Sequence, residues 1–382
     1  MIHLIDYSTL RVIWWVLVGV LLIGFAIMDG HDMGVGTLLP FVGKEDIERR
    51  VMINTIAPHW DGNQVWFITA GGAVFAAWPF VYATAFSGFY WAMMITLWAL
   101  FFRPVGFDYR SKINNKTWRT AWDWGLFIGG FVPPVIFGVA FGNLLLGVPF
   151  HFDNNLVSTY EGSFWSLLNP FALLCGLVSS AMVTLHGAVY LSHRTEGDVQ
   201  RRAKAWVTVL GIVVVVLFSL AGVWIAYGIE GYRIISAIDP NGASNPLTKT
   251  VVRETGAWLH NYQVWPLFIA FPVLGYLGEL GAVLLVRMGK TLLAFVSSAL
   301  GLAGIIGTAG ISLFPFIMPS SSNMTSSLTV WDATSSHMTL FIMLVAALIF
   351  VPIILIYTSW AYAVMRGKVT AAYIRENSHS VY

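Results

Sequence analysis

The sequence predicts an all-α integral membrane protein with about nine transmembrane helices. Three observations support this class: 57% of the 382 residues are hydrophobic, only 10% are charged, and the apolar residues gather into runs of bilayer-spanning length. The net charge of +2 gives no support for a nucleic-acid partner. Because Cys175 is the only cysteine, the sequence also excludes an intramolecular disulfide and a cysteine-based metal site.

Residues 1–382 are expected to form one polytopic transmembrane domain, because no internal repeat or low-complexity stretch divides them. Crossing a bilayer takes about 20 apolar residues. Nine runs meet this length, at 10–29, 58–77, 80–102, 121–146, 165–191, 205–229, 262–286, 291–317 and 338–364.

Connections rich in Lys and Arg alternate along the chain with connections that have few or none, as expected for helices with one fixed orientation in the membrane. Two connections, 147–164 and 318–337, carry neither residue, whereas 230–261 is long and mixed. The basic segments are 30–57, 103–119, 192–204, 287–290 and the tail after 364. Since basic connections remain in the cytoplasm, nine spans place the N-terminus in the periplasm and the C-terminus in the cytoplasm.

Five carboxylates fall at the expected cytoplasmic ends of the first four spans. They are Asp29, Asp32, Asp61, Asp108 and Asp123. If these spans are neighbours, the carboxylates would form one acidic vestibule, with His31 and His59 in the same layer. Asp29 and Asp32 share a helical face if the first helix continues past them. An intramembrane acid is a candidate for a proton or ion path.

The segment 58–66, PHWDGNQVW, concentrates polar side chains at the start of the predicted span 58–77. In a helix, Asp61 and Gln64 project together, and His59 and Asn63 form a second pair. Inserting an aspartate at the centre of a membrane helix costs roughly 2.5–3.5 kcal/mol. The polar residues of 58–66 therefore favour a functional explanation. Asp61 is the strongest candidate for proton handling, because no basic residue lies within one helical turn of it.

Structural roles compete with this interpretation for the other acids. Asp123 follows Arg119 by four residues, the spacing of an ion pair on a helix. Asp108 lies between Arg103 and Arg110 and would neutralise them.

The remaining polar residues also have structural alternatives. Asp29-Gly30 would end the first helix, with Asp32 as the N-cap of the next element. The amides and the histidine of 58–66 would hydrogen-bond between helices. Glu279 is the most buried carboxylate of the sequence and would be functional unless a basic residue of a neighbouring span pairs with it.

Two further predictions concern caps and ligands. Asp332 is expected to cap a helix or to lie on the outer surface. None of the usual metal-binding spacings of His, Glu and Cys is present, so we expect no metal ligand and no haem ligand in this chain.

Seven segments resemble subunit II of the cytochrome bd ubiquinol oxidases, and the resemblance covers nearly the whole chain. The segments are RVIWW at 11–15, MDGHDMGVG at 28–36, PHWDGNQVW at 58–66, FFRPVGFDYR at 101–110, GVAFGN at 138–143, FPFIMPSS at 314–321 and WDATSS at 331–336. His31 departs from the family pattern, which usually has Phe at this position. The exchange adds a titratable group to the predicted acidic layer.

The resemblance implies a terminal oxidase of the bacterial inner membrane that oxidises ubiquinol, reduces dioxygen to water and draws protons from the cytoplasm. It implies that haem b558, haem b595 and haem d belong to subunit I, and that subunit II supports subunit I and supplies a cytoplasmic proton pathway. In some members subunit II holds a structural quinone in a lipid-facing groove, and a small single-span subunit is a possible further partner.

The resemblance also assigns pathway residues by position. Asp61 looks like the family's proton-path aspartate. The other pathway candidates are Asp29, Asp32 and Asp108 near the start of the pathway, Asp123, and His59 and Gln64 beside Asp61. No catalytic residue is expected in this chain.

Two other classes compete with the oxidase interpretation. A secondary transporter would also have about nine spans and buried acids, but it would more often show a pseudo-repeat and broken helices near the midplane, and the sequence shows neither. A purely structural subunit would have every acid paired. A redox spectrum distinguishes the oxidase from the transporter, and substitution of Asp61 distinguishes the proton path from the scaffold.

Overall fold

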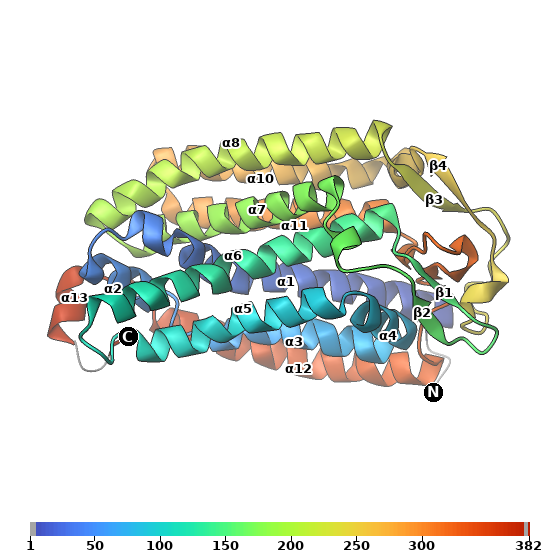
Figure 1. Cartoon of the computed structure of the whole chain (residues 1–382), viewed down its shortest axis with the longest axis horizontal. Helices are drawn as coiled ribbons and strands as arrows, with labels where there is room; N and C mark the ends of the chain where they lie inside the picture. Colours follow the sequence, from blue (N-terminus) through green and yellow to red (C-terminus); the bar gives the residue numbers. More distant parts are fainter. Residues whose placement is uncertain (1–4, 378–380) are drawn as a thin grey trace.

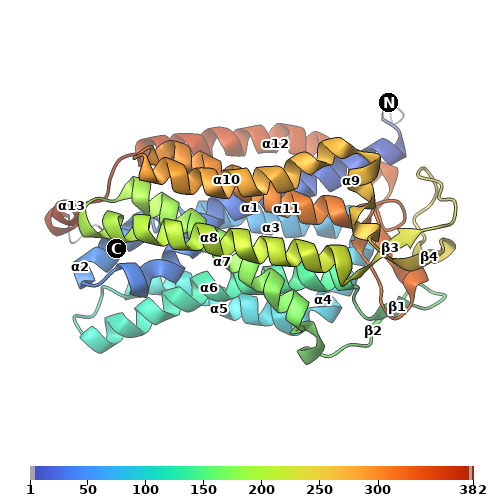
Figure 2. The same ribbon diagram turned by 90° about the horizontal axis from the view of Figure 1, so that it is seen from above.

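Long helices lie side by side along one axis in the computed structural model, which describes residues 5–377 and 381–382 (Figure 1 and Figure 2). The helices are α1 (Tyr7–Val42), α2 (Asp46–Asn54), α3 (Trp60–Ala77), α4 (Pro79–Gly88), α5 (Tyr90–Tyr109), α6 (Lys116–Leu146), α7 (Pro170–Arg194), α8 (Gly197–Tyr227), α9 (His260–Val264), α10 (Ala270–Arg287), α11 (Thr291–Leu313), α12 (His337–Val364) and α13 (Ala371–Glu376). Three antiparallel hairpins join them: β1 (Phe150–Phe152) with β2 (Ser158–Tyr160), β3 (Glu230–Ile234) with β4 (Val251–Thr255), and β5 (Phe316–Met318) with β6 (Leu328–Thr329).

The described residues contain eight helices that are long and apolar enough to cross a membrane. The bent pair α3–α4 supplies a ninth crossing when it is counted as one span. These numbers confirm the predicted helical membrane class and its span count.

The bundle has two chemically different ends. We call the end with α2, α13 and the C-terminus the basic end, and the end with the N-terminus and the strand hairpins the hairpin end (Figure 1). Successive long helices alternate between these ends, so the connections 110–115, 195–196 and 288–290 all lie at the basic end. Most Lys and Arg residues therefore gather at one end, as the alternation in the sequence predicts.

The third predicted run, 80–102, does not form one helix. The axis of α4 turns by 119° from that of α3, and the crossing resumes only with α5. Pro79 explains the break, because a proline restricts the residue before it, and Trp78 leaves the helical region with φ −131° and ψ 73°. α4 packs against β2 at the hairpin end (Figure 1). The break therefore differs from the midplane break of a transporter.

α1 is a central helix of 36 residues, roughly 54 Å long at 1.5 Å per residue. It packs against α3, α6 and α7. The helix continues through Asp29, Gly30 and Asp32 to Val42. The prediction that Asp29-Gly30 ends the helix and that Asp32 caps the next one is therefore wrong, while the prediction that the two acids share one continuous helix is confirmed.

Glycines bring the backbones of α1 and α7 into contact. A Cβ atom at Gly34 would overlap the carbonyl oxygen of Val183 and lie 2.9 Å from the Cα atom of Gly187. Small residues at such contacts allow close van der Waals packing, which drives helix association where lipid removes the hydrophobic driving force.

Candidate functional site

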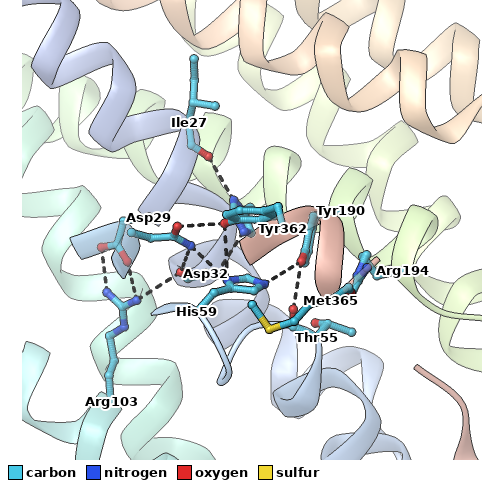
Figure 3. Close-up of polar contacts among 12 residues, drawn as sticks. Ile27, Asp29, Asp32, Thr55, His59, Arg103, Tyr190, Arg194, Tyr362 and Met365 are labelled. Atoms are coloured by element: carbon cyan, nitrogen blue, oxygen red, sulfur yellow. Dashed lines mark hydrogen bonds and ion pairs between the residues drawn. The ribbon is translucent and has the colours of Figure 1, made fainter. Parts of the chain in front are cut away.

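A buried polar cluster lies among α1, α3, α5, α7 and α12, towards the basic end (Figure 3). Its first part is a two-point ion pair between α1 and α5. Arg103 donates through Nη1 to Asp29 Oδ2 at 2.8 Å and through Nη2 to Asp29 Oδ1 at 2.5 Å. Both side chains are buried, with Asp29 at 0% and Arg103 at 2% exposure. The prediction that Arg103 lies in a basic connection is wrong, because α5 extends past it and carries the guanidinium into the bundle.

Asp32 is the second buried carboxylate of α1. Its Oδ2 accepts a hydrogen bond from Asn63 Nδ2 at 2.8 Å and lies 3.8 Å from Arg103 Nη2. Its Oδ1 lies 3.2 Å from His31 Nε2. Asp32 therefore lies near the same arginine as Asp29, but it is farther from the guanidinium and makes no hydrogen bond with it (Figure 3).

His59 and Asn63 form the pair that their spacing predicts. Asn63 Nδ2 donates to His59 Nδ1 at 3.2 Å, and Asn63 Oδ1 accepts from the Tyr362 hydroxyl of α12 at 2.8 Å. His59 Nε2 lies 3.1 Å from the Tyr190 hydroxyl of α7, which itself donates to the carbonyl oxygen of Thr55 at 2.9 Å. These bonds connect three helices around the start of α3.

Asp123 belongs to a separate ion-pair cluster at the basic end. Arg110 donates to it through Nε at 2.5 Å, and Arg49 donates through Nη1 at 2.7 Å. The predicted pair between Asp123 and Arg119 is wrong, because Asp123 points inward while Arg119 reaches Asp46 at 2.7 Å. The prediction that Asp108 neutralises Arg103 and Arg110 is also wrong, since Asp29 and Asp123 do so.

Asp61 and Asp108 lie on the surface of the chain. Neither makes an ion pair or a side-chain hydrogen bond within the part of the chain that the structure describes. Asp61 lies on the exposed stripe of α3 that also includes Ile68, at 68% exposure, and Phe75, at 60%. Gln64 is half-buried beside this stripe. The five carboxylates therefore do not form one vestibule within this chain.

One trio has the proximity of a metal site. His31, Asp32 and His59 each place a possible ligand atom within 4.8 Å of the others. His59 Nδ1, however, already accepts a hydrogen bond from Asn63. The trio is better explained as part of the hydrogen-bond cluster than as a set of metal ligands.

Two further buried acids lie outside the cluster. Glu279 is 1% exposed, so the prediction that it is the most buried carboxylate is wrong, because Asp29 is 0% exposed. No described residue hydrogen-bonds to either carboxyl oxygen of Glu279, so the alternative of a basic partner finds no support within the described chain. Asp332 does not cap α12, because Ser336 does so. Asp332 instead pairs with the buried Lys249 at 2.8 Å. Burial lowers the pKa of Lys249, and the Asp332 carboxylate opposes that shift.

Sequence reasoning missed Arg103, Tyr190 and Tyr362 as members of the cluster. Arg103 directly follows an apolar run, and this position was a signal for its entry into the bundle. The two tyrosines gave no signal, since a tyrosine near a span end is ordinary at a membrane interface.

A second feature is a largely apolar cavity of about 660 Å³ between α1, α6, α7, α8, α10 and α11. Phe25, Phe137 and Phe141 line it, and Tyr262 and Gln263 contribute polar groups. Its size suits a long apolar molecule with a polar head.

Long apolar helices with buried ion pairs and a hydrogen-bonded cluster towards one end define a polytopic helical membrane protein. A family model described as cytochrome bd terminal oxidase subunit II matches residues 10–365. The chain belongs to this family. It is 59% identical to cytochrome bd-I ubiquinol oxidase subunit 2 of Escherichia coli (strain K12) over 379 residues, which cover 99% of this chain and 100% of the relative. It is 34% identical to cytochrome bd ubiquinol oxidase subunit 2 of Bacillus subtilis (strain 168) over 367 residues, which cover 95% and 98%.

The fold is also similar to a chain in the solved structure of the bd oxidase from Geobacillus thermodenitrificans. The TM-score is 0.66 at 17% sequence identity, over 94% of this chain and 98% of that chain. At this identity the similarity concerns the fold.

Family membership makes the chain the second subunit of a terminal quinol oxidase complex, a multi-pass protein of a bacterial inner membrane that accompanies a first subunit. Complexes of this family contain haem and quinone. In this chain, His186 has both ring nitrogens in hydrogen-bonding range, of Ser298 Oγ at 2.7 Å and of the Ile27 carbonyl oxygen at 3.0 Å. Its surroundings therefore fit a structural histidine better than a haem ligand.

Proposed function

We propose that this chain supports the haem-bearing subunit and supplies part of the route by which cytoplasmic protons reach the site of dioxygen reduction. The names of the relatives support ubiquinol as the electron donor. In this proposal the haems b558, b595 and d lie in subunit I, and a small single-span subunit and membrane lipid complete the complex.

The proposed orientation follows from the distribution of basic residues. The basic end faces the cytoplasm, because Lys and Arg near the ends of spans are retained there. The hairpin end then faces the periplasm. The polar cluster of α1 and α3 lies nearer the proposed cytoplasmic side, where protons are taken up.

The exposed and unpaired carboxylate of Asp61 is the observation that carries the proposal. A carboxylate on a lipid-facing stripe is unfavourable, so the face of α3 that carries Asp61, Ile68 and Phe75 is better covered by protein. We place subunit I on this face. Asp61 would then line a polar contact between the subunits, with Gln64 beside it on the same helix and Asp108 on α5.

The other predicted pathway residues divide into two groups in this proposal. His59 and Asp32, which the amide of Asn63 connects, offer hydrogen-bonding groups inside the chain. Asp29 and Asp123 form ion pairs with arginines, so they contribute to the local electrostatic field and to helix packing.

Replacing Asp61 by asparagine tests the proposal. The exchange keeps the shape but removes the proton-carrying group, so we expect oxidase turnover to fall by about tenfold or more, since a positioned proton-transfer group contributes 10²–10⁴-fold in many enzymes. Steady-state oxygen consumption per haem measures this. Asp198→Asn is the matched control, because Asp198 is also exposed at the basic end but pairs with Arg201. Wild-type turnover of Asp61→Asn with a full haem complement would favour the purely structural subunit.

We also propose that the apolar cavity holds the isoprenoid chain of a structural quinone. Gly222 lines this cavity, and a Cβ atom there would meet nothing within 4 Å. Gly222→Trp should therefore add a bulky ring at the lining of the cavity without a backbone clash, and we expect the variant to lose about one quinone per complex. Solvent extraction and quantification of quinone per haem measures the loss. Gly19→Trp, on a site that is also open, is the control. Equal quinone content in both variants and the wild type would refute this occupant.

A further inference from the structure

His31 is a fully buried histidine to which the proposed route assigns no task. It lies on α1 between Asp29 and Asp32. Aromatic rings surround it: the ring centroids of Tyr190 and Phe295 lie 4.2 Å and 5.8 Å away. The site is therefore enclosed, and every polar atom in it needs a hydrogen-bond partner.

The hydrogen bonds of His31 fix which of its nitrogens carries a proton. Nδ1 lies 3.1 Å from the carbonyl oxygen of Ile27, which only accepts, so Nδ1 is the donor. In the neutral ring Nε2 is then an acceptor. Nε2 lies 3.2 Å from Asp32 Oδ1, and neither atom completes a hydrogen bond with any described residue. Two buried acceptors face each other, which is unfavourable unless one of them carries a proton.

None of the donors near this pair reaches Asp32 Oδ1. Arg103 bonds both oxygens of Asp29, and its Nη2 lies nearest the other oxygen of Asp32, Oδ2, at 3.8 Å. Asn63 donates to Asp32 Oδ2 and to His59 Nδ1. The hydroxyl protons of Tyr190 and Tyr362 go to the Thr55 carbonyl and to Asn63 Oδ1 respectively.

Two neighbouring histidines are also committed. Because the Tyr190 hydroxyl already donates, His59 Nε2 must donate to it, and that ring is satisfied as a neutral side chain. His186 Nε2 donates to the Ile27 carbonyl. No described donor remains for Asp32 Oδ1.

The charges lead to the same result. Asp29 and Asp32 share one arginine, because Arg103 pairs with Asp29 and lies 3.8 Å from Asp32. The other cation of the cluster, Arg194, instead donates to the Met365 carbonyl oxygen and lies over the Tyr190 ring. An ionised Asp32 with neutral histidines would therefore leave two carboxylates beside one arginine, with one negative charge in excess. A single proton on Asp32 or His31 removes both this charge and the clash of acceptors.

We propose that His31 and Asp32 together hold one exchangeable proton and act as a proton store on the uptake route. In one state Asp32 carries the proton on Oδ1 and donates it to His31 Nε2. In the other state the O–H bond has broken and an N–H bond has formed, giving an imidazolium beside a carboxylate. No other bond changes. The role as a store rests on the proposed function, whereas the shared proton does not.

Infrared spectroscopy of the purified complex tests the shared proton. In His31→Phe the proton has only Asp32 to occupy, so we expect a carboxylic acid C=O band that shifts on exchange from H₂O to D₂O and is lost in the double variant His31→Phe/Asp32→Asn. His193→Gln is the control, because His193 lies on α7 and bonds Thr291 instead. An ionised Asp32 in His31→Phe would overturn the proposal. So would a stoichiometric divalent metal that the wild type holds and His31→Phe lacks.

A second readout keeps the test informative if the Asp32→Asn variants assemble poorly. Aspartate labelled with ¹³C identifies the band as that of an aspartate, and its shift between the wild type and His31→Phe then tests the contact with His31. An identical aspartate band in both proteins would overturn the shared proton.

The pH profile of turnover tests the role as a store. A store matters most where free protons are scarce, so the ratio of wild-type to His31→Phe kcat should grow by about threefold or more from acidic to alkaline pH, as for loss of a proton-transfer group. A ratio that does not change with pH would overturn the role. Failure of the proposed function would appear separately, as normal turnover of Asp61→Asn, and would leave the infrared result in force.

Discussion

Replacement of Arg103 by alanine is expected to prevent assembly of the complex. The substitution removes the partner of Asp29 and the nearest cation to Asp32, and leaves two buried carboxylates in the bundle. Breaking a buried ion pair by removing one partner costs about 3–5 kcal/mol, a large part of the 5–15 kcal/mol that stabilises a typical domain. The yield of purified complex and its haem content measure the effect.

The matched control removes both charges of the pair. Asp29→Asn with Arg103→Gln leaves no unpaired charge at Asp29, so this double variant should assemble better than Arg103→Ala. A double variant that assembles worse, or an Arg103→Ala complex with wild-type yield and stability, would show that the pair does not stabilise the bundle.

Replacement of Gly34 by valine is the second change with a large expected effect. The new Cβ atom would overlap the backbone oxygen of Val183 and lie 2.9 Å from the Cα atom of Gly187. Backbone atoms cannot rotate away, so α1 and α7 must separate, at a cost of about 1–3 kcal/mol or more. We expect a lower melting temperature and a loss of complex, measured by thermal denaturation followed through the haem absorbance.

Gly19→Val is the control for the Gly34 variant. Gly19 lies on the same helix, and a Cβ atom there would meet nothing within 4 Å. Equal stability of the two variants would mean that the close contact of α1 with α7 does not limit stability.

The composition and the apolar runs were sufficient to predict the fold class. Spans of membrane helices follow from local composition, because each helix satisfies its own backbone hydrogen bonds. The end of the first span was predicted too early, since Asp29 and Gly30 look like a helix end in the sequence. In the structure Arg103 compensates the charge of Asp29, and the helix continues.

The partners in the polar cluster could not be predicted from local spacing. Asp29 and Arg103 are 74 residues apart, and their contact depends on how α1 packs against its neighbours. The local pairing of His59 with Asn63, four residues apart, was predicted and is confirmed. For Asp123 the spacing was misleading. Arg49 and Arg110, which other helices bring near it, pair with Asp123 in place of the expected Arg119.

The proposal for Asp61 depends on a surface that one chain does not complete. Its exposure distinguishes it from Asp29, Asp32 and Asp123, which this chain buries. The sequence could identify Asp61 as a costly and unpaired acid, but the side of α3 on which it lies became visible only with the packing of the bundle.

A single-turnover reaction of the fully reduced complex with dioxygen tests the proton route most directly. A pH-indicator dye reports proton uptake while the haem absorbance reports the oxygen reaction. In Asp61→Asn, oxygen binding should keep its wild-type rate, while proton uptake and the later haem changes should slow together by about tenfold or more. Proton uptake at the wild-type rate in an Asp61→Asn complex with a full haem complement would contradict the proposed route.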